Sequence, residues 1–141
     1  MTRYVESSAV LAWLLGEVRG GAVIELLVNA DMVVTSELTQ VEIDRALHRY
    51  VAVGAFDRTT ADLLSERADE LTAGWGIEPI SQPVVERARR SFPQDAIRSF
   101  DAIHLATAEV VRSAIDDLDV LSLDERIRSN ARVLGFRVLP D

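Results

Sequence analysis

Short apolar runs rich in valine, leucine and isoleucine alternate with helical patterns along the chain, and this alternation restricts the fold more than any other feature. We expect strands at residues 4–5, 32–35, 75–80, 120–123 and 136–139. We expect helices at residues 9–17, 36–51, 57–73, 82–91, 99–115 and 124–134, and a further helix that ends near residue 29. Apolar strands separated by helices are typical of a parallel sheet that is covered on both faces. The chain is therefore predicted to be α/β, a three-layer α/β/α sandwich with a central parallel sheet.

Polar residues at the predicted helix starts support these boundaries. Ser7 and Ser8 are candidate N-caps for the first helix, and Ser36 and Ser99 are candidates for two later ones. Serine suits this position because its side chain accepts a hydrogen bond from a backbone N–H that the helix leaves free. Gly135 is expected to end the last helix.

The length and composition indicate one soluble domain. A chain of 141 residues can bury a core without a disulfide or a structural metal. It has no cysteine, which excludes disulfides, thiolate metal sites and cysteine nucleophiles. Its longest apolar run, residues 9–15, is too short to span a bilayer or to act as a signal sequence. We expect a single domain over residues 1–141 and a cytoplasmic location.

The charge balance limits how the chain can bind a polyanion such as nucleic acid. All 15 basic residues are arginine, and 23 acidic residues give a formal net charge of −8. Such a chain is not expected to bind nucleic acid by bulk attraction, because that binding depends on cations that neutralise phosphates. The absence of lysine also excludes P-loop and Schiff-base chemistry. A nucleic-acid substrate would need a local arginine patch or a bound metal ion.

Four carboxylates occur where predicted strands end or along predicted helices near their starts. They are Glu6 after the first strand, Glu42 about two turns into a helix, Asp101 in the first turn of a helix, and Asp124 after the fourth strand. Functional groups of an open parallel sheet gather beyond the carboxyl ends of its strands. Several converging oxygens are what Mg²⁺ or Mn²⁺ requires. The four acids are therefore candidates for one metal site.

Each acid also has a purely structural interpretation. Asp101 and Asp124 would interact favourably with the dipoles of the helices that they begin. Glu42 would pair with Arg45, one turn along the same helix, or remain unpaired. Glu6 is harder to explain in this way, because an unpaired charge between a strand and an apolar helix is unfavourable.

His104 lies three residues after Asp101, on the same helix face. A metal-binding histidine with this spacing would be expected in a pair of acid–histidine motifs, as in four-helix di-iron sites, and the chain has one such motif. We therefore interpret His104 as a hydrogen-bonded structural histidine. The acidic stretch at residues 116–119 lacks the turn glycine of a calcium loop and is interpreted as a solvated loop.

Four segments of the chain resemble the signature segments of the PIN domain. They are residues 4–10, 41–47, 99–108 and 121–126, in the same order as in the family. The chain length and the segment Asp-Ala-Ile-His-Leu-Ala-Thr-Ala at residues 101–108 are most similar to VapC toxins of bacterial toxin–antitoxin pairs. The segments reach from residue 4 to residue 126, so the resemblance covers essentially the whole chain as a single PIN-like domain.

The resemblance implies a Mg²⁺- or Mn²⁺-dependent endoribonuclease, the toxin of a type II toxin–antitoxin pair, which a cognate antitoxin holds inactive. The implied catalytic acids are Glu6, Glu42, Asp101 and Asp124, with Glu6, Asp101 and Asp124 as metal ligands and Ser8 and Ser122 as supporting hydroxyls. Residue 6 departs from the family, which usually has aspartate there. Glutamate places its carboxylate about one methylene further out, and Mg²⁺ tolerates little departure from octahedral geometry. The departure leaves a non-catalytic or catalytically weakened PIN-fold interaction protein as the alternative.

The residue inventory favours metal-activated water over acid–base catalysis by histidine. His48 and His104 are the two histidines, a poor basis for a two-histidine ribonuclease. A metal ion that lowers the pKa of bound water needs no such pair, and the hydroxide would attack phosphorus in line.

An arginine cluster just before Asp101 either contacts the RNA backbone or forms an ordinary exposed helix face. It consists of Arg87, Arg89, Arg90 and Arg98.

Two further expectations concern another class of protein and the assembly. A phosphoacceptor receiver domain shares the alternating architecture and the clustered acids, but its chemistry requires a lysine beside them, which this chain lacks.

The apolar helices at residues 9–15 and 22–28 hold more large side chains than one sheet face needs, and VapC-like proteins commonly pair. We therefore expect a homodimer.

Overall fold

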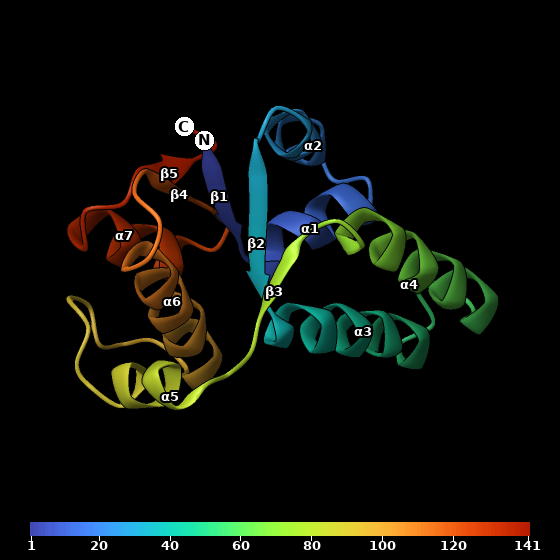
Figure 1. Cartoon of the computed structure of the whole chain (residues 1–141). Coiled ribbons are helices and arrows are strands. Elements are labelled where there is room, and N and C mark those ends of the chain that lie inside the picture. The colour runs from blue at the N-terminus through green and yellow to red at the C-terminus, as the bar shows by residue number, and fades with distance from the viewer.

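The structure is a computed structural model that describes all of residues 1–141, and a five-stranded parallel sheet forms its centre (Figure 1). The strands are β1 (Thr2–Val5), β2 (Met32–Ser36), β3 (Gly76–Glu78), β4 (Leu118–Leu121) and β5 (Val138–Leu139). Their order is β3-β2-β1-β4-β5, and every neighbouring pair is parallel. The predicted parallel α/β sheet is confirmed. Strand order reverses between β1 and β4, the place where open sheets of this kind form binding sites.

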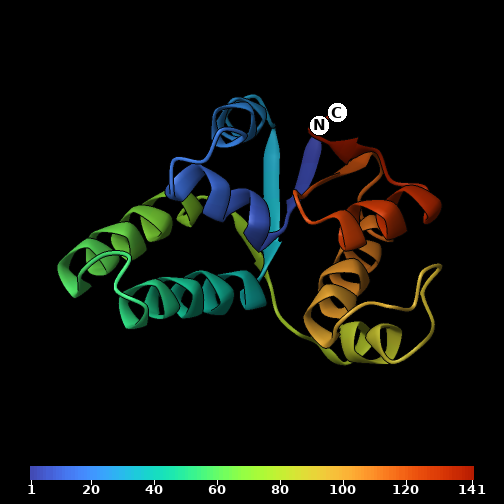
Figure 2. The ribbon, with the colours of Figure 1, turned by 180° about the vertical axis from the view of Figure 1, so that it is seen from behind.

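Seven helices cover the sheet. They are α1 (Ser7–Leu14), α2 (Gly20–Val28), α3 (Glu37–Ala52), α4 (Arg58–Thr72), α5 (Gln82–Ala88), α6 (Ser99–Arg112) and α7 (Glu125–Val133). The first four lie on one side of the sheet and the last three on the other, as Figure 1 and the reverse view in Figure 2 show. This arrangement confirms the three-layer α/β/α sandwich. None of the helices is at once long and apolar enough to cross a bilayer.

Two hydrophobic clusters, one on each face of the sheet, hold the layers together. Successive residues of a strand point to opposite faces, so β1 contributes to both clusters. Tyr4 belongs to the cluster that contains Leu105 of α6. Val5 belongs to the other cluster, with Val10 of α1 and Ile43 of α3. The alternation therefore brings the Tyr4 side chain to the α6 side of the sheet, close to the end of β1.

The predicted N-cap of the first helix is wrong. α1 begins at Ser7, but its N-cap is Glu6, whose carboxylate accepts a hydrogen bond from the backbone N–H of Ser8. The hydroxyls of Ser7 and Ser8 donate to Glu6 and do not cap the helix. The general preference for serine as an N-cap led to the wrong prediction, because Glu6 is buried within reach of both serine hydroxyls and accepts their hydrogen bonds.

Other predicted boundaries are partly right. Ser36 caps α3 and Gly135, with a φ of +87°, follows α7, as predicted. The N-cap of α6 is Arg98 and not Ser99, and the side chain of Asp101 accepts a hydrogen bond from the Arg98 backbone N–H. β4 ends two residues before its predicted end, because its neighbours β1 and β5 also end there.

Candidate active site

The candidate acids come to the edge of the sheet at which β1 and β4 end. Glu6 directly follows β1, and Ser122 directly follows β4. Asp124, two residues later, is the N-cap of α7. Glu42 comes from α3 on one side of the sheet, and Asp101 comes from the first turn of α6 on the other. Both helical layers therefore supply an acid to the point at which strand order reverses.

Glu6 is buried, with 4% of its surface exposed, and hydrogen bonds from three serines surround its carboxylate. Oε1 accepts from Ser7 Oγ at 2.7 Å and from the Ser8 N–H at 3.0 Å. Oε2 accepts from Ser122 Oγ at 2.7 Å and from the Ser8 hydroxyl. A carboxylate offers about four lone-pair directions, so protein donors occupy all of those on Glu6. These donors stabilise the buried charge that was hard to explain from the sequence.

The same hydroxyls continue into the turn after β4. Ser8 Oγ accepts from the Leu123 N–H at 2.9 Å, and Ser122 Oγ accepts from the Asp124 N–H at 3.1 Å. The network therefore joins the β1–α1 turn to the β4–α7 turn, with Glu6 at its centre. The structure places Ser8 and Ser122 beside the acid at position 6, as the resemblance implied.

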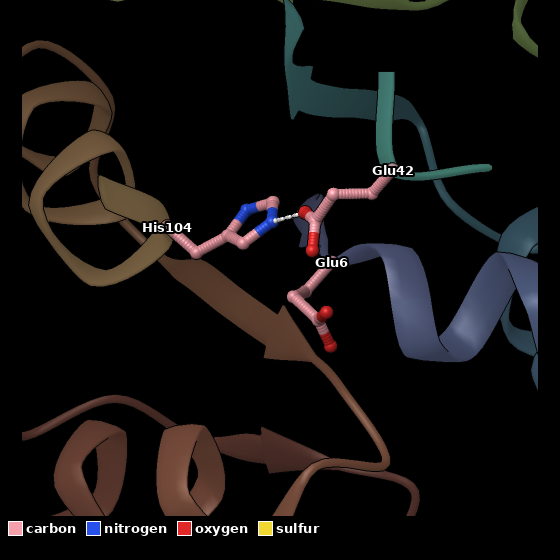
Figure 3. A group of neighbouring side chains, drawn as sticks. All are labelled: Glu6, Glu42 and His104. Carbon is pink, nitrogen blue, oxygen red and sulfur yellow. Dashed lines mark hydrogen bonds and ion pairs between the residues drawn. The ribbon is translucent and has the colours of Figure 1, made fainter. Parts of the chain in front are cut away.

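Glu42 and His104 form a second pair, which Figure 3 shows. His104 Nε2 lies 2.5 Å from Glu42 Oε1, and His104 Nδ1 lies 2.8 Å from the hydroxyl of Tyr4. One ligand atom from each of Glu6, Glu42 and His104 lies within 4.8 Å of the other two. His104 is thus hydrogen-bonded, as predicted, and Glu42 pairs with it and not with Arg45.

Asp101 is half-buried, and burial is the largest cause that raises the pKa of its carboxyl. The charges of Asp124 and Glu6 raise this pKa further, whereas the Arg98 N–H and the charge of Arg126 lower it. Asp101 therefore lies in the field of two other acids, and the protein does not fully compensate the negative charge. Asp101 and Asp124 lie outside the compact group of Glu6 and its two neighbours. The four acids thus share one edge of the sheet but form two subsets.

Asp101 and Asp124 each bond the start of a helix through one carboxylate oxygen. Asp101 Oδ2 accepts from the Arg98 N–H at 3.1 Å. Asp124 Oδ1 accepts from the N–H groups of Arg126 at 2.9 Å and Ile127 at 3.4 Å. The structural interpretation of both acids therefore applies. Asp101 Oδ1 and Asp124 Oδ2 receive no hydrogen bond from the protein, so each aspartate keeps one oxygen for a cation.

The arginines predicted to meet RNA differ in how freely they can do so. Arg87 Nε lies 2.6 Å from Glu109 Oε2, and its guanidinium lies 4.0 Å from the centre of the Phe92 ring. The charge of Arg87 is thus used within the protein. The other three, Arg89, Arg90 and Arg98, are exposed.

Sequence reasoning missed two residues at this edge. Arg126 is exposed in the first turn of α7, and its charge acts on Asp101. Its position two residues after Asp124 was the available signal. The sequence pattern predicts Tyr4 only as a strand residue. Strand alternation places it on the same side as Glu6, two residues later, which is a weaker signal.

The chain is similar to known proteins along almost its whole length. The family model described as PIN domain matches residues 3–133. Ribonuclease VapC35 of Mycobacterium tuberculosis is 29% identical over 138 residues, which cover 96% of this chain and 94% of the relative. A chain of a solved toxin–antitoxin complex from Klebsiella pneumoniae has a TM-score of 0.67 at 17% identity, with 98% of this chain and 96% of that chain covered. The crystal structure of Mycobacterium tuberculosis VapC20, a sarcin–ricin loop cleaving toxin, has a TM-score of 0.65 at 18% identity, with 95% of each chain covered.

Proposed function

This chain belongs to the PIN-domain family, and from that premise we propose that it is a metal-dependent endoribonuclease, the toxin of a type II toxin–antitoxin pair. The observation that carries the proposal is the meeting of acids from four separate segments at the ends of β1 and β4. A relative named as a ribonuclease spans nearly the whole chain, and a chain of a toxin–antitoxin complex has the same fold. These similarities support the reaction class and the type of partner.

The acids at this edge fit a hard divalent cation. Burial and the charges of Asp124 and Glu6 raise the pKa of Asp101, and a cation among these carboxylates would offset that repulsion. The free oxygens of the two aspartates suit Mg²⁺ or Mn²⁺. We propose that Asp101 and Asp124 hold the ion, directly or through water, and that Glu42 completes the site. Glu6, whose lone pairs the serine donors occupy, adds its negative charge beside the ion. When bound, the ion lowers the pKa of a water molecule and offsets charge on the phosphate that is cleaved.

The protein's own residues hold and orient the reacting groups. Ser8 and Ser122 keep the Glu6 carboxylate in place, and Glu6 in turn ties together the two turns that carry the site. Asp124 is fixed as a helix N-cap. Glu42 Oε1 is bonded to the histidine of α6, while its Oε2 receives no hydrogen bond from the protein. We assign to Glu42 Oε2 the proton that the attacking water gives up.

RNA is the proposed substrate, and local arginines would offset the negative charge of the chain where RNA binds. Arg98 and Arg126 are exposed beside Asp101, and Arg89 and Arg90 are exposed at the end of α5. Arg87 belonged to the predicted cluster but is less suited, because it is already paired within the protein.

We also propose two protein partners, an antitoxin that restrains the activity and a second copy of the chain. Exposed apolar side chains on and before α2 support the homodimer. Val18 is fully exposed, and Val28 is 76% exposed. Burying such residues against a second copy would remove apolar surface from water.

Cleavage of a short single-stranded RNA by the purified protein tests the proposal. We expect cleavage that requires Mg²⁺ or Mn²⁺ and that Asp101→Asn abolishes. The matched control is Asp62→Asn, which changes an exposed aspartate of α4 in the same way. Cleavage by Asp101→Asn at the rate of the parent would remove Asp101 from the mechanism.

The alternative is a non-catalytic or catalytically weakened PIN-fold interaction protein. The four hydrogen bonds on Glu6 favour it, because they leave that carboxylate no lone pair for a metal ion. A metal titration separates the two proposals. An unchanged melting temperature up to millimolar Mg²⁺ or Mn²⁺ would favour the interaction protein.

A further inference from the structure

A buried chain of hydrogen bonds runs from the sheet into the candidate site. The Tyr4 hydroxyl lies 2.8 Å from His104 Nδ1, and His104 Nε2 lies 2.5 Å from Glu42 Oε1. Tyr4 and His104 are each 1% exposed, and their rings meet edge to face. The three residues come from β1, α6 and α3. The chain of bonds therefore spans all three layers and ends on an acid of the site.

The direction of these hydrogen bonds follows from the carboxylate of Glu42, which accepts hydrogen bonds and donates none. A hydrogen bond between His104 and this carboxylate therefore places a proton on His104 Nε2. In the neutral imidazole this leaves Nδ1 as an acceptor, so the Tyr4 hydroxyl donates to it. Both ring nitrogens are then occupied. His104 thus holds a carboxylate and is not itself free to bind a metal ion.

Glu42 needs such a partner to remain where it is. Its carboxylate lies within 4.8 Å of that of Glu6, and two like charges at this separation repel each other. Glu42 is half-buried on α3, so its flexible side chain has water within reach as an alternative. Figure 3 shows the His104 ring directed at one carboxylate oxygen of Glu42, with Glu6 beside the pair. The bond from His104 therefore opposes the repulsion that would turn Glu42 away.

We propose that Tyr4 and His104 are positioning residues, which act through Glu42 by holding its carboxylate at the metal-binding edge. This role rests on the proposed function. Partners that orient the ligands of a metal site typically change metal affinity or activity by about 10–100-fold when they are replaced. Tyr4→Phe removes only the hydroxyl at the far end of the hydrogen-bonded chain and keeps the buried aromatic ring. An effect at the lower end of this range, about tenfold, is therefore expected.

The sequence supplies its own matched controls, because it has two tyrosines and two histidines. Tyr50 and His48 are exposed residues of α3 that lie outside the hydrogen-bonded chain, so Tyr50→Phe is the control variant and His48 is the reference histidine. We expect Tyr4→Phe to raise the Mn²⁺ dissociation constant, measured by calorimetry, and to lower kcat/KM, whereas Tyr50→Phe changes neither. In a Glu42→Gln background, Tyr4→Phe should add no further loss, because its effect passes through Glu42.

Nitrogen-15 NMR of the two histidines gives a readout that does not depend on metal or activity. We expect His104 to be fixed as the Nε2–H tautomer in the metal-free parent and to become a mixture of tautomers in Tyr4→Phe, with His48 unchanged. An Nδ1–H tautomer in the parent would overturn the proposal. So would a Tyr4→Phe variant that binds Mn²⁺ and cleaves RNA as well as an active parent. A parent that neither binds Mn²⁺ nor cleaves RNA would instead refute the proposed function, and the positioning role with it.

Discussion

Replacing Glu6 by aspartate tests how the acid at this position shapes the site. The glutamate carboxylate receives hydrogen bonds from Ser7, Ser8 and Ser122. Aspartate is a good N-cap and should keep the bond from the Ser8 N–H, which lies two residues away. Ser122 belongs to the neighbouring strand end, so a carboxylate drawn back by one methylene should lose that bond first. Glu6→Asp therefore exchanges a bond within the protein for a freed carboxylate oxygen.

The size of the effect follows from the lost bond. A hydrogen bond to a charged group contributes about 1.5–3 kcal/mol, so the metal-free variant should lose about 2 kcal/mol of stability. At about 3 °C per kcal/mol for a domain of this size, its melting temperature should fall by about 6 °C. With Mg²⁺ present, we expect the freed oxygen to bind the ion. The metal should then raise the melting temperature of Glu6→Asp by more than that of the parent, and the cleavage rate should rise.

Calorimetric melting with and without Mg²⁺, together with RNA cleavage by the same preparations, measures both effects. Glu66→Asp, an exposed substitution of the same kind on α4, is the control and should change neither quantity. If Glu6→Asp weakens both Mg²⁺ binding and cleavage, the backbone suits glutamate and our reasoning about the serine bonds is wrong. If both stay unchanged, residue 6 does not touch the ion.

Three further outcomes are expected. Asp101→Asn should leave the metal-free protein at least as stable as the parent at neutral pH, as measured by denaturant unfolding, because burial and the charges of Asp124 and Glu6 disfavour the ionised carboxyl. The raised pKa of Asp101 also means that its favourable contribution to stability is fully present below its ordinary unfolded pKa and is lost as the pH rises through the folded value. At a pH above the folded-state pKa of Asp101, no proton competes with the ion, so Mg²⁺ should raise the melting temperature most there. A melting-temperature shift that is largest at acid pH would contradict this. Light scattering at micromolar concentration should give the mass of a dimer, and a monomeric mass would count against the proposed pairing.

The sequence by itself determined the class of fold and the chemical kind of site. Helix and strand periods are local properties, so the apolar runs of β2 and β4 and the helices between them were predicted with small errors at their ends. Because parallel strands end at a common edge, the position of Glu6 after β1 and of Asp124 after β4 indicated one site.

Only the tertiary structure decided which partner each of these groups has. Ser122 reaches Glu6 across 116 positions of sequence, and His104 meets Glu42 across 62 and Tyr4 across 100. A periodic pattern records the face on which a side chain lies, but the residue that it meets there depends on strand order and on how the helices pack over the sheet. The order β3-β2-β1-β4-β5 places β4 beside β1, and this pairing brings the serine of one turn onto the carboxylate of the other.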